Sequence, residues 1–324
     1  MQEGRIPQFS RRDFLKTGVA AALLSGVEKA SQRVTPVNFA IPVNACDCHT
    51  HIFGNPSQFP MWAGRAYTPE TALPEEMAAL HRALHLDRVV IVTPSVYGAD
   101  NSATLYGMKP RGGNARGVAV IDENTRESDL DAMGTAGIRG IRLNLAIAGR
   151  IDPVTGRERL LAAFHRVARR HWHIQIFTNL PMISALSDLV RDSPVPVVFD
   201  HFGGAQASLG LAQPGFADLV ALVRSGKAYV KISGAYRCST EAPDYADMAP
   251  FAKALIAANT ERVIWGTDWP HPDSVTPAGH KPADVTPLLR IDDGRLLNQL
   301  PVWAPDPAIR KTILVDNPAR LYGF

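Results

Sequence analysis

The sequence predicts a single, distorted (β/α)8 barrel of the TIM type with short extra elements, placed after an N-terminal signal segment. Three observations support this fold. From residue 43 on, short β-branched runs alternate with helical patterns. Most of these runs are continuously apolar, as in parallel strands that are covered on both faces. The length of 324 residues suits one barrel as well as two smaller domains.

Eight strand–helix units are expected in about 280 residues. The expected strands span residues 43–49, 88–95, 115–122, 138–145, 173–179, 195–201, 228–236 and 262–269. The expected helices span residues 74–86, 127–136, 156–170, 182–192, 215–225 and 245–258. An open doubly wound sheet is the alternative, but no G-x-G-x-x-G motif follows the first strand.

The net charge of +3 is concentrated at the N-terminus. Residues 1–33 carry six of the 34 basic groups and three of the 31 acidic groups, which leaves 28 of each sign in residues 34–324. The predicted barrel therefore has no overall charge that would favour nucleic acid. Any attraction for an anionic substrate must come from a few local side chains.

The first 33 residues are expected to be a signal and linker, and residues 34–324 the barrel domain. The segment S-R-R-D-F-L-K at 10–16 precedes a short apolar run and resembles a twin-arginine export signal through Arg11 and Arg12. This resemblance implies a bacterial protein that is exported to the periplasm by the twin-arginine machinery. An amphipathic start to the fold is the alternative. No stretch reaches the 18 or so apolar residues of a membrane helix, so no stable membrane span is expected.

Cysteine usage indicates packing rather than cross-linking. Cys46 and Cys48 share one face of a strand, a poor geometry for a disulfide, and Cys238 stands alone. The C-x-C pattern is not a zinc motif, and small buried residues are expected here.

Polar side chains gather at the C-terminal ends of the predicted strands, where active sites of such barrels lie. In chain order they are Asp47, His49, His51, Ser95, Asp122, Arg142, Asn144, Thr178, Asn179, Asp200, His201, Lys231, Ser233, Arg237, Asp268 and His271. Contact with water explains one or two of them, but not an ionisable residue at nearly every strand. The pattern indicates a catalytic site at this end of the barrel.

His49 and His51 lie two residues apart on one face of the first strand. Closure of the barrel brings the eighth strand, and with it Asp268, beside this pair. His201 enters from the sixth strand. Six other histidines are expected to be ordinary surface or core residues: His81, His85, His165, His171, His173 and His280.

The motifs D-C-H-T-H (47–51), D-H-F-G (200–203) and W-G-T-D-W-P-H-P (265–272) resemble those of the amidohydrolase superfamily. Within it, the chain is most similar to the branch that contains 2-pyrone-4,6-dicarboxylate lactonase and the sugar lactonases. The likeness runs from about residue 43 to 320 and includes R-A-Y-T-P (65–69), P-S-V-Y-G-A-D-N (94–101), R-L-N-L (142–145) and K-I-S-G-A-Y-R (231–237).

The resemblance bears on metal binding. Metal-dependent members add a histidine on the fifth strand or a carboxylated lysine on the fourth, where this chain has Thr178–Asn179 and Arg142. A binuclear centre is therefore not expected. His49, His51 and Asp268 suffice for one catalytic zinc with water completing the shell. The lactonase branch is described as working without metal, so the expectation is no obligatory cofactor and at most one divalent ion.

The groups suggest a mechanism for lactone hydrolysis, which needs an activated water, a stabilised oxyanion and a proton for the leaving oxygen. Asp268 is the candidate base. His49, His51 and His201, or a metal that they hold, would polarise the carbonyl. No G-x-S-x-G motif is present, which disfavours a serine acyl-enzyme, and Ser95 is expected to hydrogen-bond the substrate.

Arginines suggest an acidic substrate, because guanidinium groups bind carboxylates with two parallel hydrogen bonds. Arg65, Arg142, Arg150 and Arg237 lie at strand ends or in adjacent loops, and the resemblance adds Tyr67 as a further substrate contact. The related lactonase carries an arginine three residues after the sixth-strand histidine, where this chain has Gly204. This departure favours a related acidic lactone over the pyrone dicarboxylate itself.

The sequence therefore predicts an exported hydrolase of a carboxylated lactone, that is, a carboxylic-ester hydrolase. A zinc-dependent decarboxylase and a lactone isomerase of the same superfamily remain alternatives. A periplasmic binding protein for acidic sugars or aromatics would explain the arginines, but not the two histidines beside an aspartate.

Overall fold

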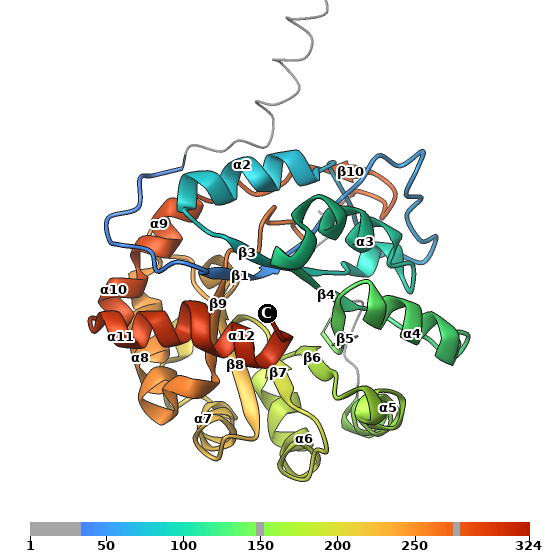
Figure 1. Cartoon of the computed structure of the whole chain (residues 1–324). Coiled ribbons are helices and arrows are strands. Elements are labelled where there is room, and N and C mark those ends of the chain that lie inside the picture. The colour runs from blue at the N-terminus through green and yellow to red at the C-terminus, as the bar shows by residue number, and fades with distance from the viewer. Residues whose placement is uncertain (1–33, 147–151, 275–278) are drawn as a thin grey trace, which may run out of the picture.

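The predicted barrel is confirmed. The computed structural model describes residues 34–146, 152–274 and 279–324, and shows eight parallel strands in a ring with helices outside (Figure 1). The strands, in the order of the ring, are β1 (Cys46–Thr50), β3 (Arg88–Val92), β4 (Ala115–Ala119), β5 (Ile138–Asn144), β6 (His173–Phe177), β7 (Val197–Phe199), β8 (Ala228–Ser233) and β9 (Val263–Gly266). The predicted signal at 1–33 and the predicted substrate contact Arg150 lie outside the described residues.

The ring closes between its last and first strands just beyond β9. The backbone N–H of Asp268 donates to the carbonyl oxygen of His49 at 2.8 Å, and that of His51 donates to the carbonyl oxygen of Trp269 at 2.8 Å. These two bonds place Asp268 beside the histidine pair, as expected from barrel closure.

Helices cover the outside of the ring (Figure 1). They are α2 (Pro74–Leu84), α3 (Ser102–Met108), α4 (Glu127–Thr135), α5 (Pro153–Val167), α6 (Leu180–Arg191), α7 (Phe216–Arg224) and α8 (Ala249–Ala258). All six predicted helices are present with shifted ends, whereas α3 is one that the sequence analysis missed. The C-terminal part adds α9 (Asp293–Asn298), α10 (Leu300–Trp303), α11 (Pro307–Lys311) and α12 (Asn317–Tyr322). The expected short extra elements include a parallel pair, β2 (Thr68–Pro69) with β10 (Val285–Thr286).

The observed strands are shorter than predicted because their polar ends turn away from the ladder. The sixth strand was expected over residues 195–201, but β7 ends at Phe199 and a 3-10 turn begins at His201. In the same way β8 ends at Ser233, and residues Ala235–Arg237 form a 3-10 turn. The predicted catalytic residue His201 and the predicted substrate contact Arg237 therefore sit on turns that follow the strands.

Apolar side chains form two layers. A large cluster fills the space between strands and helices, and a smaller one fills the barrel interior. Cys46 and Cys48 belong to the interior cluster together with Val90 and Val118, which confirms their predicted packing role. Tyr322 of α12 closes this cluster at the end of the barrel where the strands begin.

A β-bulge in β1 determines which of its side chains face the interior. Asp47 pairs with Val89, but Thr50 pairs with Ile91, so β1 uses one residue more than β3. Asp47 lies on the outer side, where it accepts hydrogen bonds from Thr267 and contacts His81 of α2 at 3.2 Å. The extra residue allows the two cysteines before it and the two histidines after it all to face inward.

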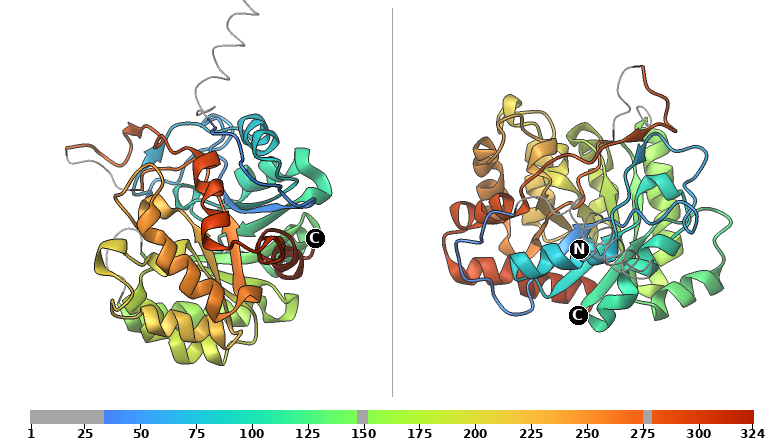
Figure 2. Two further views of the ribbon diagram at one scale, coloured as in Figure 1. Left: turned by 90° about the vertical axis from the view of Figure 1, so that its left-hand side faces the viewer. Right: turned by 90° about the horizontal axis from the view of Figure 1, so that it is seen from above.

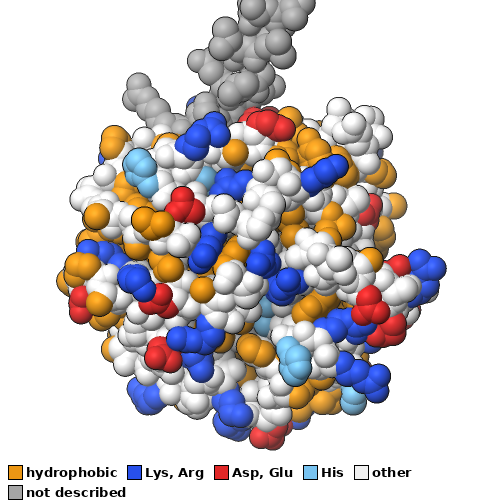
Figure 3. All heavy atoms as spheres, viewed as in Figure 1, with side chains coloured by type: hydrophobic (Ala, Val, Ile, Leu, Met, Phe, Trp, Pro, Cys, Tyr) orange, Lys and Arg blue, Asp and Glu red, His pale blue; other side chains and the backbone are white. Residues whose placement is uncertain are grey.

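The two ends of the barrel differ. α12 lies at one end, and the segment that leads into β10 lies at the opposite end (Figure 2). The face viewed in Figure 3 shows Lys and Arg side chains interspersed with acidic and apolar ones. Within the described ranges, every helix is too short or too polar to cross a membrane.

Candidate active site

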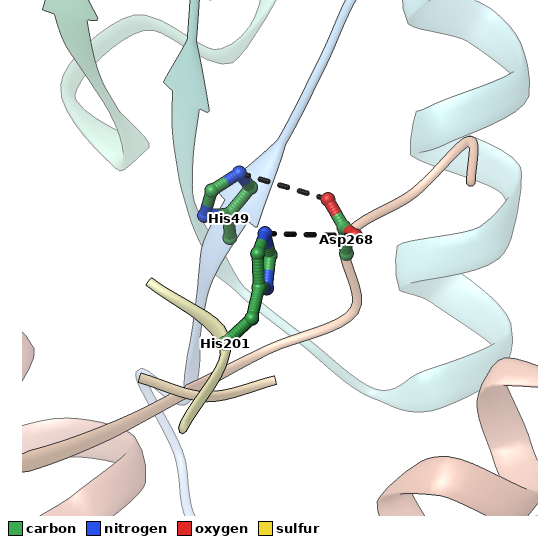
Figure 4. Close-up of side chains that lie close together, drawn as sticks. All are labelled: His49, His201 and Asp268. Carbon is green, nitrogen blue, oxygen red and sulfur yellow. Dashed lines mark ion pairs between the residues drawn. The ribbon is translucent and has the colours of Figure 1, made fainter. Parts of the chain in front are cut away.

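The four predicted catalytic residues meet at the carboxyl ends of the strands. His49 Nε2 and His51 Nε2 lie 3.6 and 3.7 Å from Asp268 Oδ1, and His201 Nε2 lies 3.7 Å from Asp268 Oδ2. Figure 4 shows His49 and His201 pointing toward Asp268. All four side chains are buried, so their interactions are strong compared with those of exposed groups.

Two of these residues have a backbone conformation that side chains other than glycine rarely adopt. The φ angles of His201 and Asp268 are +47° and +66°. Such conformations are unfavourable by about 1–3 kcal/mol each and occur often at functional sites. Here each one turns a side chain toward the centre of the barrel directly after a strand ends.

The donor atoms are arranged to hold one metal ion. His49 Nε2 and His51 Nε2 are 3.3 Å apart, and each lies 3.6–3.7 Å from Asp268 Oδ1. Ligands about 2.0–2.1 Å from a tetrahedral zinc ion are separated from one another by roughly 3.3 Å, so these spacings fit. His49, His201 and Asp268 form a second set whose ligand atoms lie within 4.8 Å of one another.

Hydrogen bonds prepare these atoms for a cation. His51 Nδ1 lies 2.7 Å from the carbonyl oxygen of Val92 and must donate to it, which leaves the Nε2 lone pair facing the site. Asp268 Oδ1 is buried and has no hydrogen-bond partner. A buried carboxylate oxygen without a donor, beside an imidazole lone pair, is the environment that a metal ion or a proton would satisfy.

The other oxygen of Asp268 is fully engaged. Asp268 Oδ2 accepts hydrogen bonds from Tyr236 OH at 2.6 Å and from Arg237 Nε at 2.5 Å. Burial alone would raise the pKa of Asp268, but the positive charge of Arg237 holds that pKa well below its usual range. Burial raises the pKa of Tyr236 well above its usual value, so its hydroxyl remains a donor.

A buried charged network lies beneath the histidines. Lys231 Nζ donates to Gln175 Oε1 at 2.7 Å and lies 3.4 Å from Asp200 Oδ1, while Gln175 Nε2 donates to Asp200 Oδ2 at 3.0 Å. Asp200 Oδ1 and Lys231 Nζ both face His49 Nδ1, at 3.2 and 3.1 Å. Arg142 Nη2 adds a contact of 3.3 Å to Asp200 Oδ2. Burial opposes ionisation of Asp200, but Lys231 and His49 hold its pKa well below the usual range.

The histidines are neutral near pH 7. Burial lowers the pKa of His51 to about 3, helped by the positive charge of Arg142, and lowers the pKa of His201 to about 4. Burial and the charge of Lys231 lower the pKa of His49 in the same direction. Neutral imidazoles can offer a lone pair to a metal ion or a proton donor.

Two cavities share Arg142 in their linings. The smaller, about 20 Å³, is lined by His51, His201, Asp268, Tyr67 and Arg237, among others, and holds about one water-sized group. The larger, about 330 Å³, includes Ser95, Trp62, Asn144 and Arg159 in its lining. Arg142 lines both cavities. The predicted contacts Tyr67, Arg142 and Arg237 thus surround the smaller cavity, and Ser95 lies in the larger one.

Other predicted polar positions lie away from the reacting centre. Arg65 is half-buried and donates within its own loop, to Thr68 Oγ1 at 2.7 Å and to the carbonyl oxygen of Trp62 at 3.0 Å. It lines neither cavity. Asn179 caps α6 by accepting from the N–H of Met182. Arg65 and Asn179 therefore have local structural roles, in a loop and at a helix start.

Gly204 has a structural reason to lack a side chain. Its φ angle is +75°, and a Cβ atom there would come within 2.6 Å of the carbonyl oxygen of Thr178. Because backbone cannot give way as a side-chain tip can, an arginine does not fit here without a rearranged turn. The backbone conformation at Gly204 therefore explains why this chain lacks the arginine that the related lactonase carries there.

The sequence pattern alone predicts no specific role for four further residues of the site, Lys231, Gln175, Asp200 and Tyr236. Lys231 and Asp200 are among the strand-end polar residues; Lys231 interrupts an apolar run, and Asp200 directly follows one. Gln175 lies between two isoleucines of β6. A single polar residue inside a strand that is buried on both faces, as at Gln175 and Lys231, is the sequence signal that indicates such a role.

Known proteins resemble this chain over most of its length. The amidohydrolase family matches residues 46–324. A 2-pyrone-4,6-dicarboxylate hydrolase of Comamonas testosteroni is 33% identical over 293 residues, which cover 88% of this chain and 92% of the relative. A 4-sulfomuconolactone hydrolase of Rhizobium radiobacter is 34% identical over 295 residues, which cover 90% and 94%.

A solved structure from Agrobacterium tumefaciens, determined in its apo form, aligns with a TM-score of 0.73 at 29% identity. The alignment covers 90% of this chain and 99% of that protein. Because the family match extends over the whole barrel and includes His49, His51, His201 and Asp268, the chain belongs to the amidohydrolase family.

Proposed function

We propose that this protein hydrolyses an acidic lactone. The observation that carries the proposal is the buried Asp268, whose Oδ1 has no hydrogen-bond partner and faces two imidazole nitrogens in a pocket that two arginines also line. The two lactone-hydrolysing relatives, each about one third identical over most of the chain, support the reaction class.

Asp268 Oδ1 is the atom placed to take a proton from water. Its partner Oδ2 is held by Tyr236 and Arg237, so the carboxylate cannot turn away. The proton then passes from Asp268 to the ring oxygen as the ester C–O bond breaks. Hydrolysis consumes one water and opens the ring to a carboxylate and a hydroxyl group or its keto tautomer.

His49, His51 and His201 surround the position of the carbonyl oxygen. A divalent ion held by His49, His51 and Asp268 would supply a Lewis acid that polarises this carbonyl. His201 Nδ1 contacts Ser233 Oγ at 3.0 Å, which fixes the ring with Nε2 directed at the site. The protein thus presents preorganised groups to the oxygen where negative charge develops.

The two cavities suggest how a substrate is placed. The smaller cavity admits a carbonyl group and a water rather than a whole ring, so the body of the lactone would occupy the larger cavity. Arg142 lines both cavities and is placed to bind a carboxylate or sulfonate next to the reacting carbon. The steric restriction at Gly204 favours a lactone other than the pyrone dicarboxylate.

Substrate binding would also adjust the base. A substrate anion that binds Arg237 shares the guanidinium with Asp268 Oδ2 and weakens its effect on the carboxylate. The pKa of Asp268 then rises from its depressed value, which makes the group a stronger base when substrate is present.

A lactone panel followed by proton release tests this function. We expect turnover of at least one anionic lactone among 2-pyrone-4,6-dicarboxylate, 4-sulfomuconolactone, muconolactones and aldarolactones. The assay is run after chelation and again with added zinc, and products are identified by NMR. Ring-opened product indicates hydrolysis, whereas a rearranged lactone would assign an isomerase. Absence of any conversion under both conditions would sink the proposal.

We also propose that the protein is exported through its twin-arginine segment. Conversion of Arg11 and Arg12 to lysine is expected to keep the protein in the cytoplasm, because the signal is read through this pair. Fractionation of a Gram-negative host that expresses the full chain measures the effect. The matched control is Arg5→Lys, which lies outside the motif. Equal periplasmic amounts for the double variant and the control would exclude this route.

A further inference from the structure

His49 Nδ1 lies beside a hydrogen-bond donor, Lys231, and an acceptor, Asp200, and cannot satisfy both at once. Lys231 is fully buried, and its ammonium group can only donate hydrogen bonds. Asp200, ionised, can only accept them. Both groups face the same atom, His49 Nδ1, at 3.1 and 3.2 Å. This nitrogen carries a proton in one tautomer of neutral imidazole and a lone pair in the other, so it can satisfy one of the two neighbours at a time.

The choice of tautomer decides what His49 presents to the reacting centre. When Nδ1 accepts from Lys231, the proton is on Nε2. This N–H then points toward Asp268 Oδ1 and His51 Nε2, which lie 3.6 and 3.3 Å from His49 Nε2. When Nδ1 donates to Asp200, Nε2 has a bare lone pair, as a metal ligand requires. The number of protons on His49 is the same in both forms.

The first tautomer suits a site without a cation. The lone pair of His51 Nε2 and the unpartnered Asp268 Oδ1 would then share one N–H donor. In the second tautomer two imidazole lone pairs would face each other at 3.3 Å beside a carboxylate, which is favourable only with a cation between them.

We propose that Lys231 is a positioning residue that stabilises the Nε2–H tautomer of His49 and thereby weakens binding of a divalent cation at His49, His51 and Asp268. Asp200 has the opposite effect, because it stabilises the tautomer that binds metal. The inference rests on the candidate metal set and not on the identity of the lactone.

Permanent charges act in the same direction. Lys231, Arg142 and Arg237 contribute three positive charges to the site, against two negative charges on Asp200 and Asp268. A divalent ion therefore enters a site that is already net positive when the histidines are neutral. Removal of the lysine charge favours the ion, and removal of the Asp200 charge disfavours it.

Metal affinity of two variants provides the test. The full-length protein is stripped with a chelator and titrated with Zn²⁺ by calorimetry, and with Co²⁺ by its visible absorption. We expect Lys231→Met to lower the dissociation constant at least tenfold and Asp200→Asn to raise it at least tenfold. A purely structural role would weaken binding in both variants. Unchanged or weaker binding by Lys231→Met would overturn the proposal. Circular dichroism checks that each variant folds.

A second measurement needs no folded variant at position 231. In metal-free wild-type protein labelled with ¹⁵N-histidine, the His49 ring is expected to carry its proton on Nε2, and to move it to Nδ1 when Zn²⁺ is added. The resonance is identified by its loss in His49→Gln. A proton on Nδ1 in the metal-free wild type would refute the inference. Neither the metal titration nor the NMR measurement depends on lactone turnover, so both remain decisive even if no lactone of the panel is converted.

Discussion

Asp268→Asn is expected to lower kcat by about 10³-fold, within the range of 10²–10⁴ for loss of a positioned general base. The amide has the same shape, but its oxygen cannot take the proton from water. Asp268 Oδ2 is already bonded to Tyr236 and Arg237, which leaves Oδ1 to act as the base. Among the described residues, no carboxylate besides Asp268 lines the smaller cavity. KM is expected to change much less than kcat, because the two arginines remain.

Initial rates with the best lactone of the panel measure this effect, with Asp188→Asn as the matched control. Asp188 is an exposed carboxylate on the outer helix α6, where it pairs with Arg157 of α5. Excess Zn²⁺ separates two roles of Asp268: recovery by metal would indicate that it acts as a ligand rather than as the base. Activity within threefold of wild type at saturating substrate would contradict the assignment.

Acidification from pH 7 to pH 5 is expected to lower the free energy of unfolding by several kcal/mol. The pKa values of His51 and His173 are lowered to about 3 and that of His201 to about 4, chiefly by burial. In the unfolded chain these histidines titrate at about 6.5, so between pH 6.5 and 4 the unfolded state binds more protons. Stability therefore falls with pH in this window, by about 2 kcal/mol for each of the three histidines between pH 7 and 5.

Urea unfolding of the chelated protein at pH 5, 6 and 7 measures this dependence. His173→Gln is the informative control, because His173 packs against Tyr322 rather than lining the active site. Its removal is expected to reduce the slope by about 1.4 kcal/mol per pH unit, the contribution of one proton. A denaturation midpoint that stays constant from pH 7 to 5 would show that these histidines are not held neutral.

The order and type of the main elements were predictable because parallel strands buried on both faces differ strongly in pattern from the helices between them. The ends of strands were not predictable. Polar residues such as His201 extend an apolar run in the sequence, but their backbone turns away to bring the side chain over the barrel. The short helix α3, Ser102–Met108, was missed because about two turns carry little periodicity.

The catalytic group could be predicted as a set because each member ends a strand, and barrel topology brings strand ends together. The buried charged network beneath these residues, formed by Lys231, Gln175 and Asp200, could not be predicted. Whether Lys231 and Gln175 meet Asp200 depends on which face of β6, β7 and β8 is inward, and on the register between these strands. Tyr236 and Arg237 reach Asp268 only because the chain turns sharply at Gly234, whose φ is +58°.

The bulge in β1 has a consequence for how this strand tolerates change. A regular strand would have to choose between filling the barrel with Cys46 and Cys48 and presenting His49 and His51 to the substrate, since alternate residues face opposite ways. The extra residue divides the strand into an upstream part whose side chains fill the barrel interior and a downstream part whose side chains face Asp268. Substitutions of similar size at Cys46 and Cys48 are expected to leave the histidines in place, whereas loss of the extra residue would turn the side chains on one side of the bulge to the opposite face.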